Sequence, residues 1–221
     1  MGKLIVIEGL DGCGKSTQLE LLPQSLAELG VECQTVSFPN YDSDSSALVK
    51  MYLSGEFGSK PGDVNAYAAS TFYAVDRYAS YKKFWEQEYQ QDLPIIAARY
   101  TTSNAIHQMA KLPKSEWDNY LEWMEHYEYV LLGLPRPDAV IFLDMPLDIA
   151  QKLMSHRYEG DESKKDIHER DLQYLRQCRE SALYAAQKCG WQVVTCGAGD
   201  APLPPEVITE KLVHIFEETV G

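Results

Sequence analysis

Positive charge is scarce in this sequence of 221 residues. Twenty lysines and arginines stand against 33 aspartates and glutamates, which gives a formal net charge of −13. Binding of nucleic acid without sequence preference depends on Lys and Arg side chains that neutralise phosphates, so this charge argues against a nucleic-acid partner. Any anionic ligand must be met by a local group of basic residues that works against the field of the whole protein.

Cysteine pairs and long apolar segments are also missing. The five cysteines are an odd number and include no C-x-x-C pair and no zinc spacing, which favours a reducing compartment. The first apolar run, Leu4 to Ile7, meets an acid at Glu8 and is too short for a signal segment or a membrane span. We therefore expect a cytoplasmic protein without a membrane partner.

Short apolar runs alternate with helical patterns along the whole chain. The predicted strands are 4–7, 31–38, 93–98, 139–143 and 191–195, and the predicted helices are 15–29, 65–90, 117–132, 166–188 and 205–218. Such alternation predicts an α/β fold of three layers (α/β/α), in which helices cover both faces of a five-stranded parallel sheet. The chain shows no internal repeat and no interdomain linker, so residues 1–221 are predicted to form one domain.

A phosphate-binding motif follows the first predicted strand and opens the first predicted helix. Gly9-Leu10-Asp11-Gly12-Cys13-Gly14-Lys15-Ser16 fits the pattern G-x-x-x-x-G-K-[ST] in the context that this motif requires. Its glycines let backbone N–H groups surround phosphate oxygens, and the helix N-terminus adds positive potential. We expect residues 9–17 to bind ATP: Lys15 neutralises the β- and γ-phosphates, Ser16 holds Mg²⁺, and Thr17 lies on the helix side or contacts the α-phosphate.

The residues around this loop resemble the thymidylate (dTMP) kinase family of P-loop enzymes. The resemblance rests on five blocks in the family's order, namely Ile7–Gln18, Phe38-Pro39, Phe72–Arg77, Arg99–Gln108 and Pro137–Asp144. It covers nearly the whole chain. It implies transfer of the ATP γ-phosphoryl group to dTMP to give dTDP, a requirement for Mg²⁺, and a homodimer formed through the aromatic-rich helices.

The acceptor site is predicted from the resemblance together with side-chain chemistry. Arg77 and Arg99 are expected to clamp the acceptor phosphate, because guanidinium groups match phosphate oxygens bidentately. Tyr73 shares a helix face with Arg77 and is expected to stack on thymine, with Phe72 as its competitor and core packing as the alternative. Asn104 offers the donor and acceptor that a pyrimidine edge needs, or is an ordinary residue of a helix start. The other predicted acceptor-site residues are Asp11, Phe38, Ser103, His107, Gln108, Asp166 and Glu169.

Residues 156–165 are charged and poor in apolar side chains, and residues 156–170 are expected to form a mobile lid, with a solvated run of charge as the alternative. Gly12 stands where some family members have a basic residue, so the resemblance implies that a lid arginine acts on the transition state. Arg157 is the first choice, with support from Lys164, Lys165 and Arg170, and the predicted catalytic residues are Lys15, Arg99 and Arg157. Asp166 and Glu169 are expected to share a helix face and to contact the acceptor sugar or the metal. The alternative is that they only stabilise the positive N-terminal end of the helix.

Two positions depart from the family's pattern. His107 stands where many members carry a tyrosine near the sugar, which leaves discrimination against a 2′-hydroxyl open. Ala98 replaces the aspartate that normally precedes the strand-end arginine and helps to orient Mg²⁺. Three interpretations fit Ala98: compensation by Asp11 or Glu8, a deliberate substitution that traps a complex, or a slow or non-catalytic homologue. Ser16 and Asp11 are the predicted metal ligands.

Other functions remain open from the sequence. The nearest rival is a kinase for another pyrimidine monophosphate, and a different class is a nucleotide-binding protein with little or no turnover, which Ala98 would favour. A GTPase is disfavoured because the sequence contains no N-K-x-D motif.

Overall fold

The computed structural model describes residues 1–161 and 166–221, and the side chain of Arg157 is outside that description. A five-stranded sheet of parallel strands has the order β2–β3–β1–β4–β5. The strands are β1 (Leu4–Glu8), β2 (Gln34–Ser37), β3 (Ile95–Ala98), β4 (Ala139–Asp144) and β5 (Gln192–Thr195). This sheet confirms the predicted fold class.

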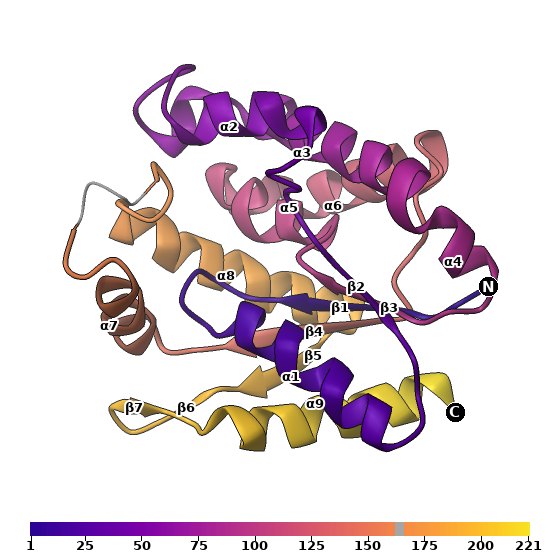
Figure 1. The fold of residues 1–221 in the computed structure, drawn as a ribbon. Helices are drawn as coiled ribbons and strands as arrows, with labels where there is room; N and C mark the ends of the chain where they lie inside the picture. Colours follow the sequence, from indigo (N-terminus) through magenta and orange to yellow (C-terminus); the bar gives the residue numbers. More distant parts are fainter. Residues whose placement is uncertain (162–165) are drawn as a thin grey trace.

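Helices cover both faces of the sheet, which makes three layers (Figure 1). On one face, Ile5 and Ile7 of β1 pack against α1 (Lys15–Glu28) and α9 (Pro205–Val220). On the other face, Leu4, Val6 and Phe142 contact two further clusters of buried residues. The elements of that layer include α3 (Ala66–Ser80), α4 (Glu86–Gln90), α5 (Thr102–His107), α6 (Trp117–Glu125) and α8 (Leu172–Cys189). Of two further helices, α7 (Leu147–Arg157) contributes Ile149 and Ala150 to the first cluster, and α2 (Ala47–Leu53) packs Tyr52 in a separate cluster with Ala69 of α3.

The strand order places a crevice at the carboxyl end of β1. The next strand in the chain, β2, lies two positions away on one side, and β4 pairs with β1 on the other. Ligands of open parallel sheets bind at such a switch point, outside the carboxyl ends of the strands. Both chain termini lie at the opposite end of the sheet from α7 (Figure 1). The phosphate loop, residues 9–14, leaves β1 directly into this crevice.

Several predicted boundaries are wrong. The helix predicted over 65–90 is interrupted by a π-helical segment, Tyr81–Trp85, and the one over 117–132 ends in another, His126–Leu131. The helix predicted from Asp166 begins at Leu172, because Asp171 caps it by accepting a hydrogen bond from the Tyr174 N–H at 2.9 Å. Short elements that the sequence did not predict are α2, α5, α7 and a hairpin of β6 (Gly197–Ala198) and β7 (Ala201–Pro202).

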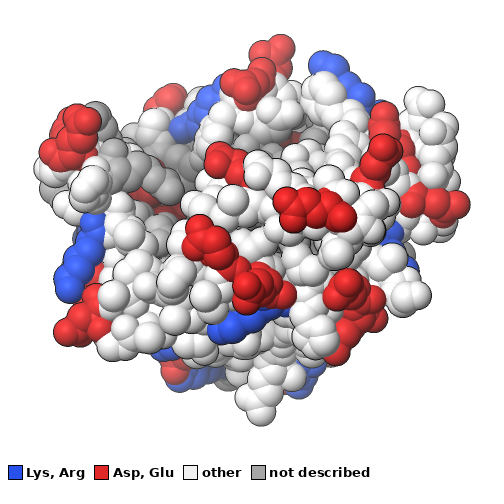
Figure 2. Space-filling view, turned by 60° about the horizontal axis from the view of Figure 1, so that its bottom comes forward, with Lys and Arg blue, Asp and Glu red and all other residues white. Residues whose placement is uncertain are grey.

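The surface and the cysteines agree with the composition. Acidic side chains are spread over the face that Figure 2 shows, among few basic ones. All five cysteines are free thiols. Within residues 1–161 and 166–221, no helix has both the length and the apolar character needed to cross a bilayer.

Candidate active site

A cavity of about 760 Å³ opens at the crevice and brings most of the predicted site together. The predicted residues that line it are Asp11, Gly12, Gly14, Lys15, Ser16, Phe38, Tyr73, Arg77, Arg99, Ser103, Asn104, His107, Gln108, Asp166, Glu169 and Arg170. Ala98 also lines it. These residues come from the phosphate loop and the start of α1, the end of β2, α3, the end of β3, α5 with the residue that follows it, and the segment before α8. One cavity therefore joins the donor and acceptor residues predicted from separate parts of the sequence.

Some predicted residues are not among those that line the cavity, namely Gly9, Leu10, Cys13, Thr17 and Phe72. The carbonyl oxygens of Gly9 and Leu10 each accept a hydrogen bond from Lys15 Nζ at 2.8 Å, and Cys13 is buried with its Sγ 3.6 Å from the same ammonium. Thr17 is exposed on α1. Phe72 packs its ring against Tyr52 and Phe57, with centroids 6.4 and 5.6 Å apart, and is not among the residues that line the cavity. Tyr73, and not Phe72, lies at the cavity.

The glycines give the phosphate loop its curvature. Gly12 and Gly14 have φ values of 79° and 95°, which L side chains rarely adopt. A Cβ at position 12 would also lie 2.6 Å from the carbonyl oxygen of Ala150, so that position has no room for a side chain. Gly14 immediately precedes α1 and serves as its N-cap. The loop therefore presents backbone N–H groups and a helix N-terminus to the cavity, as phosphate binding requires.

Arg99 connects the end of β3 to the phosphate loop. Its φ of 65° turns the chain out of the strand. Its Nη2 donates a hydrogen bond to Asp11 Oδ1 at 2.5 Å, and its Nη1 lies 3.0 Å from His107 Nε2. Burial alone would raise the pKa of Asp11, but the charges of Arg99 and Lys15 hold it well below its usual range. Asp11 is therefore ionised throughout the physiological range.

The protonation state of His107 follows from its neighbours. An arginine can only donate, so Nε2 of His107 accepts and the hydrogen of the neutral ring lies on Nδ1. Burial and the positive charge of Arg99 lower the pKa of His107 well below its usual value, which keeps the ring neutral. Nδ1 is buried and has no hydrogen-bond partner among the described residues. The Nδ1 donor is thus buried and unused, and the His107 ring is stacked on His168, with centroids 5.7 Å apart.

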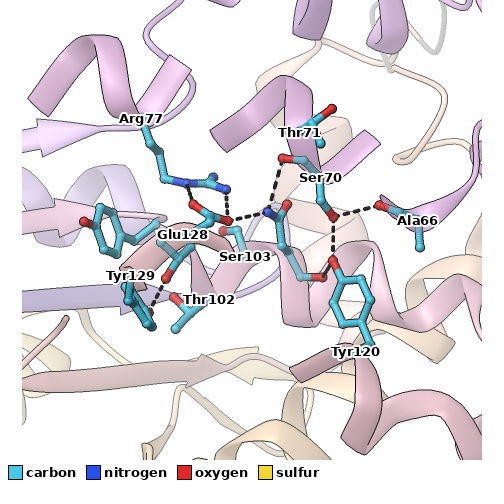
Figure 3. A network of polar contacts seen from close by, with 12 residues as sticks. Ala66, Ser70, Thr71, Arg77, Thr102, Ser103, Tyr120, Glu128 and Tyr129 are labelled. Carbon is cyan, nitrogen blue, oxygen red and sulfur yellow. Dashed lines mark hydrogen bonds and ion pairs between the residues drawn. The ribbon is translucent and has the colours of Figure 1, made fainter. Parts of the chain in front are cut away.

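Arg77 and Asn104 meet at a buried glutamate that sequence reasoning missed. Arg77 donates to Glu128 from Nε at 2.7 Å and from Nη2 at 2.6 Å, and Asn104 Nδ2 donates to the same carboxylate at 2.8 Å (Figure 3). The side chains of Arg77 and Glu128 are 2% and 1% exposed. Burial alone would lower the pKa of Arg77, but the Glu128 charge raises it, so the guanidinium stays charged. The sequence feature that could have pointed to Glu128 is its position as the one acid in the aromatic and apolar stretch Tyr127–Leu132.

Glu8 is engaged by the segment that follows β3. Its carboxylate accepts hydrogen bonds from the Tyr100 N–H at 3.1 Å, from Thr102 Oγ1 at 2.7 Å and from Ser103 Oγ at 2.9 and 2.8 Å. Glu8 is fully buried and is not among the residues that line the cavity. Of the two carboxylates that the sequence offers as compensation for Ala98, only Asp11 lies at the cavity.

The segment before α8 brings a second pair of acids to the site. Asp166 Oδ1 accepts hydrogen bonds from the His168 and Glu169 N–H groups at 2.7 and 2.9 Å, so these residues form a turn instead of the predicted helix. Tyr158 donates to both oxygens of Glu169. Burial, with the negative charges of Asp11 and Glu169, raises the pKa of Asp166 to about 6. The predicted lid residues Lys164, Lys165 and the Arg157 side chain lie outside the described residues.

The strand, glycine-rich loop and helix, together with cationic side chains around one cavity, define a P-loop nucleotide-binding phosphotransferase. A family model described as "Thymidylate kinase" matches residues 7–199. The chain is 32% identical over 216 residues to the thymidylate kinase of Mycobacterium tuberculosis, covering 92% of this chain and 99% of that one. It is 26% identical over 220 residues to the human thymidylate kinase, covering 99% of this chain and 92% of the relative.

A solved structure of the thymidylate kinase from Candida albicans shares the fold, with a TM-score of 0.68 at 22% identity. That match covers 98% of this chain and 92% of the other. The chain belongs to the thymidylate kinase family. This membership confirms the resemblance found in the sequence and favours the thymidylate kinase prediction over its alternatives.

Proposed function

We propose that this chain transfers the γ-phosphoryl group of ATP to dTMP and forms dTDP and ADP. The observation that carries the proposal is the shared cavity, which Lys15 and Ser16 of the phosphate loop line together with Arg99, Asn104 and Tyr73. A kinase for a monophosphate must hold two polyanions within reach of each other and place cations around the transferring group. In a chain of net charge −13, cations gathered at one cavity support that use.

On the donor side, the loop N–H groups and Lys15 hold the phosphates of ATP. The Lys15 ammonium already lies against the carbonyl oxygens of Gly9 and Leu10 at 2.8 Å, and in the complex it turns to the β- and γ-phosphate oxygens. Arg157 is proposed to add positive charge near the transferring group from the end of α7. Arg170, which lines the cavity, supports the same role.

On the acceptor side, Arg99 holds the phosphate and Asn104 holds the base. Arg99 contacts Asp11 of the phosphate loop, which supports its place at the reacting end. Arg77 shares the Glu128 carboxylate with Asn104, and this contact favours a role beside the base instead of the phosphate clamp predicted from the sequence. Tyr73 and Phe38 are proposed to contact the ring, and Ser103, His107, Gln108, Asp166 and Glu169 to complete the wall.

Mg²⁺ is proposed to bind with ATP, held by the Ser16 hydroxyl and by Asp11 directly or through water. Among the described residues, no group of three or more His, Cys, Asp or Glu side chains could hold a metal ion. Mg²⁺ in kinases is held by few protein groups together with phosphates and waters, so the residues present fit it. When bound, the ion would neutralise the negative charge that develops on the phosphates during transfer.

We also propose a cytoplasmic homodimer. The free cysteines support a reducing compartment. Large apolar side chains are exposed on α3 and on the π segment His126–Leu131: Val75 is 48% exposed, Tyr78 41%, Val130 58% and Leu131 65%. The two elements adjoin through the Arg77–Glu128 pair, so they offer one apolar area to a second copy. Sedimentation velocity tests this: the wild type should sediment as a dimer and Leu131→Glu as a monomer, whereas a monomeric wild type would contradict it.

The function is tested with a panel of acceptors. Purified protein with ATP and Mg²⁺ is offered dTMP, dUMP or dCMP, and the diphosphate products are separated by ion-exchange chromatography. We expect dTDP to form with the highest kcat/KM. A higher value for another pyrimidine monophosphate would favour the rival kinase, and tight nucleotide binding without any diphosphate would favour a non-catalytic homologue.

A further inference from the structure

Glu128 is a buried acid that the proposed reaction does not use directly. It lies in the π segment His126–Leu131, which continues α6, and its side chain is 1% exposed. It is not among the residues that line the cavity, although both of its partners are. π segments replace the regular helical register and often occur near functional sites. Here the segment places a carboxylate directly behind the acceptor end of the cavity.

One oxygen of Glu128 serves both partners. Oε1 accepts hydrogen bonds from Arg77 Nη2 at 2.6 Å and from Asn104 Nδ2 at 2.8 Å, and Oε2 accepts from Arg77 Nε at 2.7 Å. Arg77 and Asn104 come from different helices, α3 and α5, and have no other hydrogen-bonded link to each other among the described residues. Figure 3 shows the Arg77 guanidinium facing the Glu128 carboxylate, and Asn104 donates to the same carboxylate, so the positions of both side chains depend on it.

The carboxylate also decides which atom of the Asn104 amide faces the ligand. Glu128 Oε1 and the Ser70 carbonyl oxygen, at 2.8 and 3.5 Å from Nδ2, can only accept hydrogen bonds. The NH₂ group must therefore point to them, and the carbonyl oxygen Oδ1 points away. Oδ1 has no donor among the described residues, and Asn104 lines the cavity. The amide consequently presents an acceptor to the ligand, next to the Arg77 guanidinium, which presents donors.

We propose that Glu128 is a positioning residue that sets the base preference of the acceptor site. The inference rests on the proposed function. An acceptor next to a donor complements the imide edge of thymine or uracil, where an N–H lies beside a carbonyl oxygen. Cytosine has the opposite pattern on that edge, an unprotonated nitrogen beside an amino group. Glu128 holds Arg77 and Asn104 in one arrangement. The site therefore pairs donor with acceptor on the edge of thymine or uracil, whereas it places donor against donor and acceptor against acceptor on the edge of cytosine.

A structural role alone gives a weaker explanation of this pair. Desolvation of two buried charges offsets most of their attraction, and well-packed apolar residues often replace buried ion pairs without loss of stability. The pair is instead well suited to fix orientation, because the bidentate contact leaves Arg77 no rotational freedom and the third contact fixes the amide.

The test is Glu128→Gln, which keeps the size of the side chain and changes its hydrogen bonding. The glutamine oxygen can replace only one of the two carboxylate oxygens, so the NH₂ group faces either Arg77 Nε or both Arg77 Nη2 and Asn104 Nδ2, which are donors themselves. In either orientation donor faces donor, so Arg77 or the Asn104 amide must leave the arrangement that presents a donor beside an acceptor to the base. We expect the ratio of kcat/KM for dTMP to that for dCMP to fall at least about tenfold, since unpaired polar groups dominate such discrimination. The KM for ATP should stay unchanged.

Glu125→Gln is the matched control, because Glu125 lies three residues earlier and pairs with Arg136 at the surface, at 2.9 Å. The same chemical change there should leave the ratio unaltered. Glu128→Asp is the second variant. It keeps the charge that Arg77 needs for folding, while the shorter side chain withdraws from Asn104, so the ratio should again fall.

The outcomes separate this inference from the proposed function. Absence of dTDP formation by the wild type would refute the proposed function before any variant is compared. With an active wild type, an unchanged dTMP to dCMP ratio in either folded variant would overturn the role of Glu128. Equal losses for both acceptors, or failure of both variants to fold, would also overturn it, because Glu128 would then only support the structure.

Discussion

The guanidinium of Arg99 donates a hydrogen bond to the carboxylate of Asp11 at 2.5 Å and so joins the carboxyl end of β3 to the phosphate loop. Both side chains are partly exposed to the cavity, at 17% and 24%. The contact holds Arg99 in place before any ligand arrives, which reduces the ordering that the acceptor must cause. It also links the acceptor side of the proposed site to the donor side through one ion pair.

Arg99→Ala and Arg77→Ala are expected to weaken dTMP binding much more than ATP binding. A hydrogen bond to a charged group contributes about 1.5–3 kcal/mol, so the Kd for dTMP should rise about 10- to 100-fold. Isothermal titration of each variant with dTMP and with ATP measures the two losses. Arg136→Ala, which removes a surface ion pair with Glu125, is the control. Equal losses for both nucleotides would mean that these arginines only support the structure.

Lys15→Ala is expected to lower kcat by about 10²–10⁴, because a charge placed at the β- and γ-phosphates stabilises the transition state by several kcal/mol. Initial rates at saturating ATP and dTMP measure the effect. Lys114→Ala removes an exposed lysine that pairs with Glu180 and should leave the rate unchanged. Turnover at the wild-type rate in the Lys15 variant would show that the loop does not bind the transferring phosphates.

Asp166→Asn is expected to stabilise the fold near neutral pH. Burial and nearby acids raise the pKa of Asp166 from its ordinary 3.8 to about 6. A raised pKa means that the folded state holds the proton more tightly, so this group's stabilising contribution is full below about pH 4 and lost as the pH rises through 6. At pH 7 the ionised Asp166 carboxylate lowers the free energy of unfolding of the wild type, whereas the neutral asparagine of the variant does not.

Urea unfolding of the wild type and the Asp166→Asn variant measures this difference. The variant should be more stable by about 1–2 kcal/mol at pH 7, and the difference should shrink as the pH falls toward 4. A difference that does not depend on pH would show that Asp166 titrates normally. Activity of the variant should fall, since Asp166 lines the cavity and is proposed to contact the acceptor.

Ala98→Asp is expected to raise kcat about tenfold, equivalent to about 1.4 kcal/mol of barrier. Ala98 lines the cavity, and Glu8, the neighbouring carboxylate, is engaged by Tyr100, Thr102 and Ser103. A carboxylate at position 98 can meet Arg99 and a hydrated Mg²⁺, and better metal placement acts mainly in the transition state. Steady-state rates at saturating substrates and Mg²⁺ give kcat for the wild type and for Ala98→Asp. If kcat stays level or falls in a folded variant, another group already orients the metal.

The fold was largely predictable from the sequence because its cues are local. The run Leu4–Ile7 is buried on both faces of the sheet, so it reads as an uninterrupted apolar segment, and Lys15 follows the glycine pattern of the phosphate loop. The boundary at Asp166 was mispredicted because Asp166 and Asp171 compete for the start of α8 with similar side-chain hydrogen bonds.

The polar contacts behind the cavity were not predictable, because they join residues that are distant in the chain. Glu128 lies 51 residues from Arg77 and 24 from Asn104, and only the folded chain brings them together. The pairing of Arg99 with Asp11 spans 88 residues. The sequence indicated most of the predicted side chains that line the cavity, but their hydrogen-bond partners, and with them the position of Arg77 beside Asn104, follow from tertiary structure.

Transfer of labelled phosphate from γ-labelled ATP to dTMP tests the proposed activity most directly. The protein, Mg²⁺ and labelled ATP are incubated with and without dTMP, and the products are resolved by thin-layer chromatography. The label should appear in dTDP only when dTMP is present, at a rate that Lys15→Ala lowers by about 10²–10⁴. Label that remains in ATP, or appears only as free phosphate, with a folded protein that binds both nucleotides would contradict the assignment of this chain as an active thymidylate kinase.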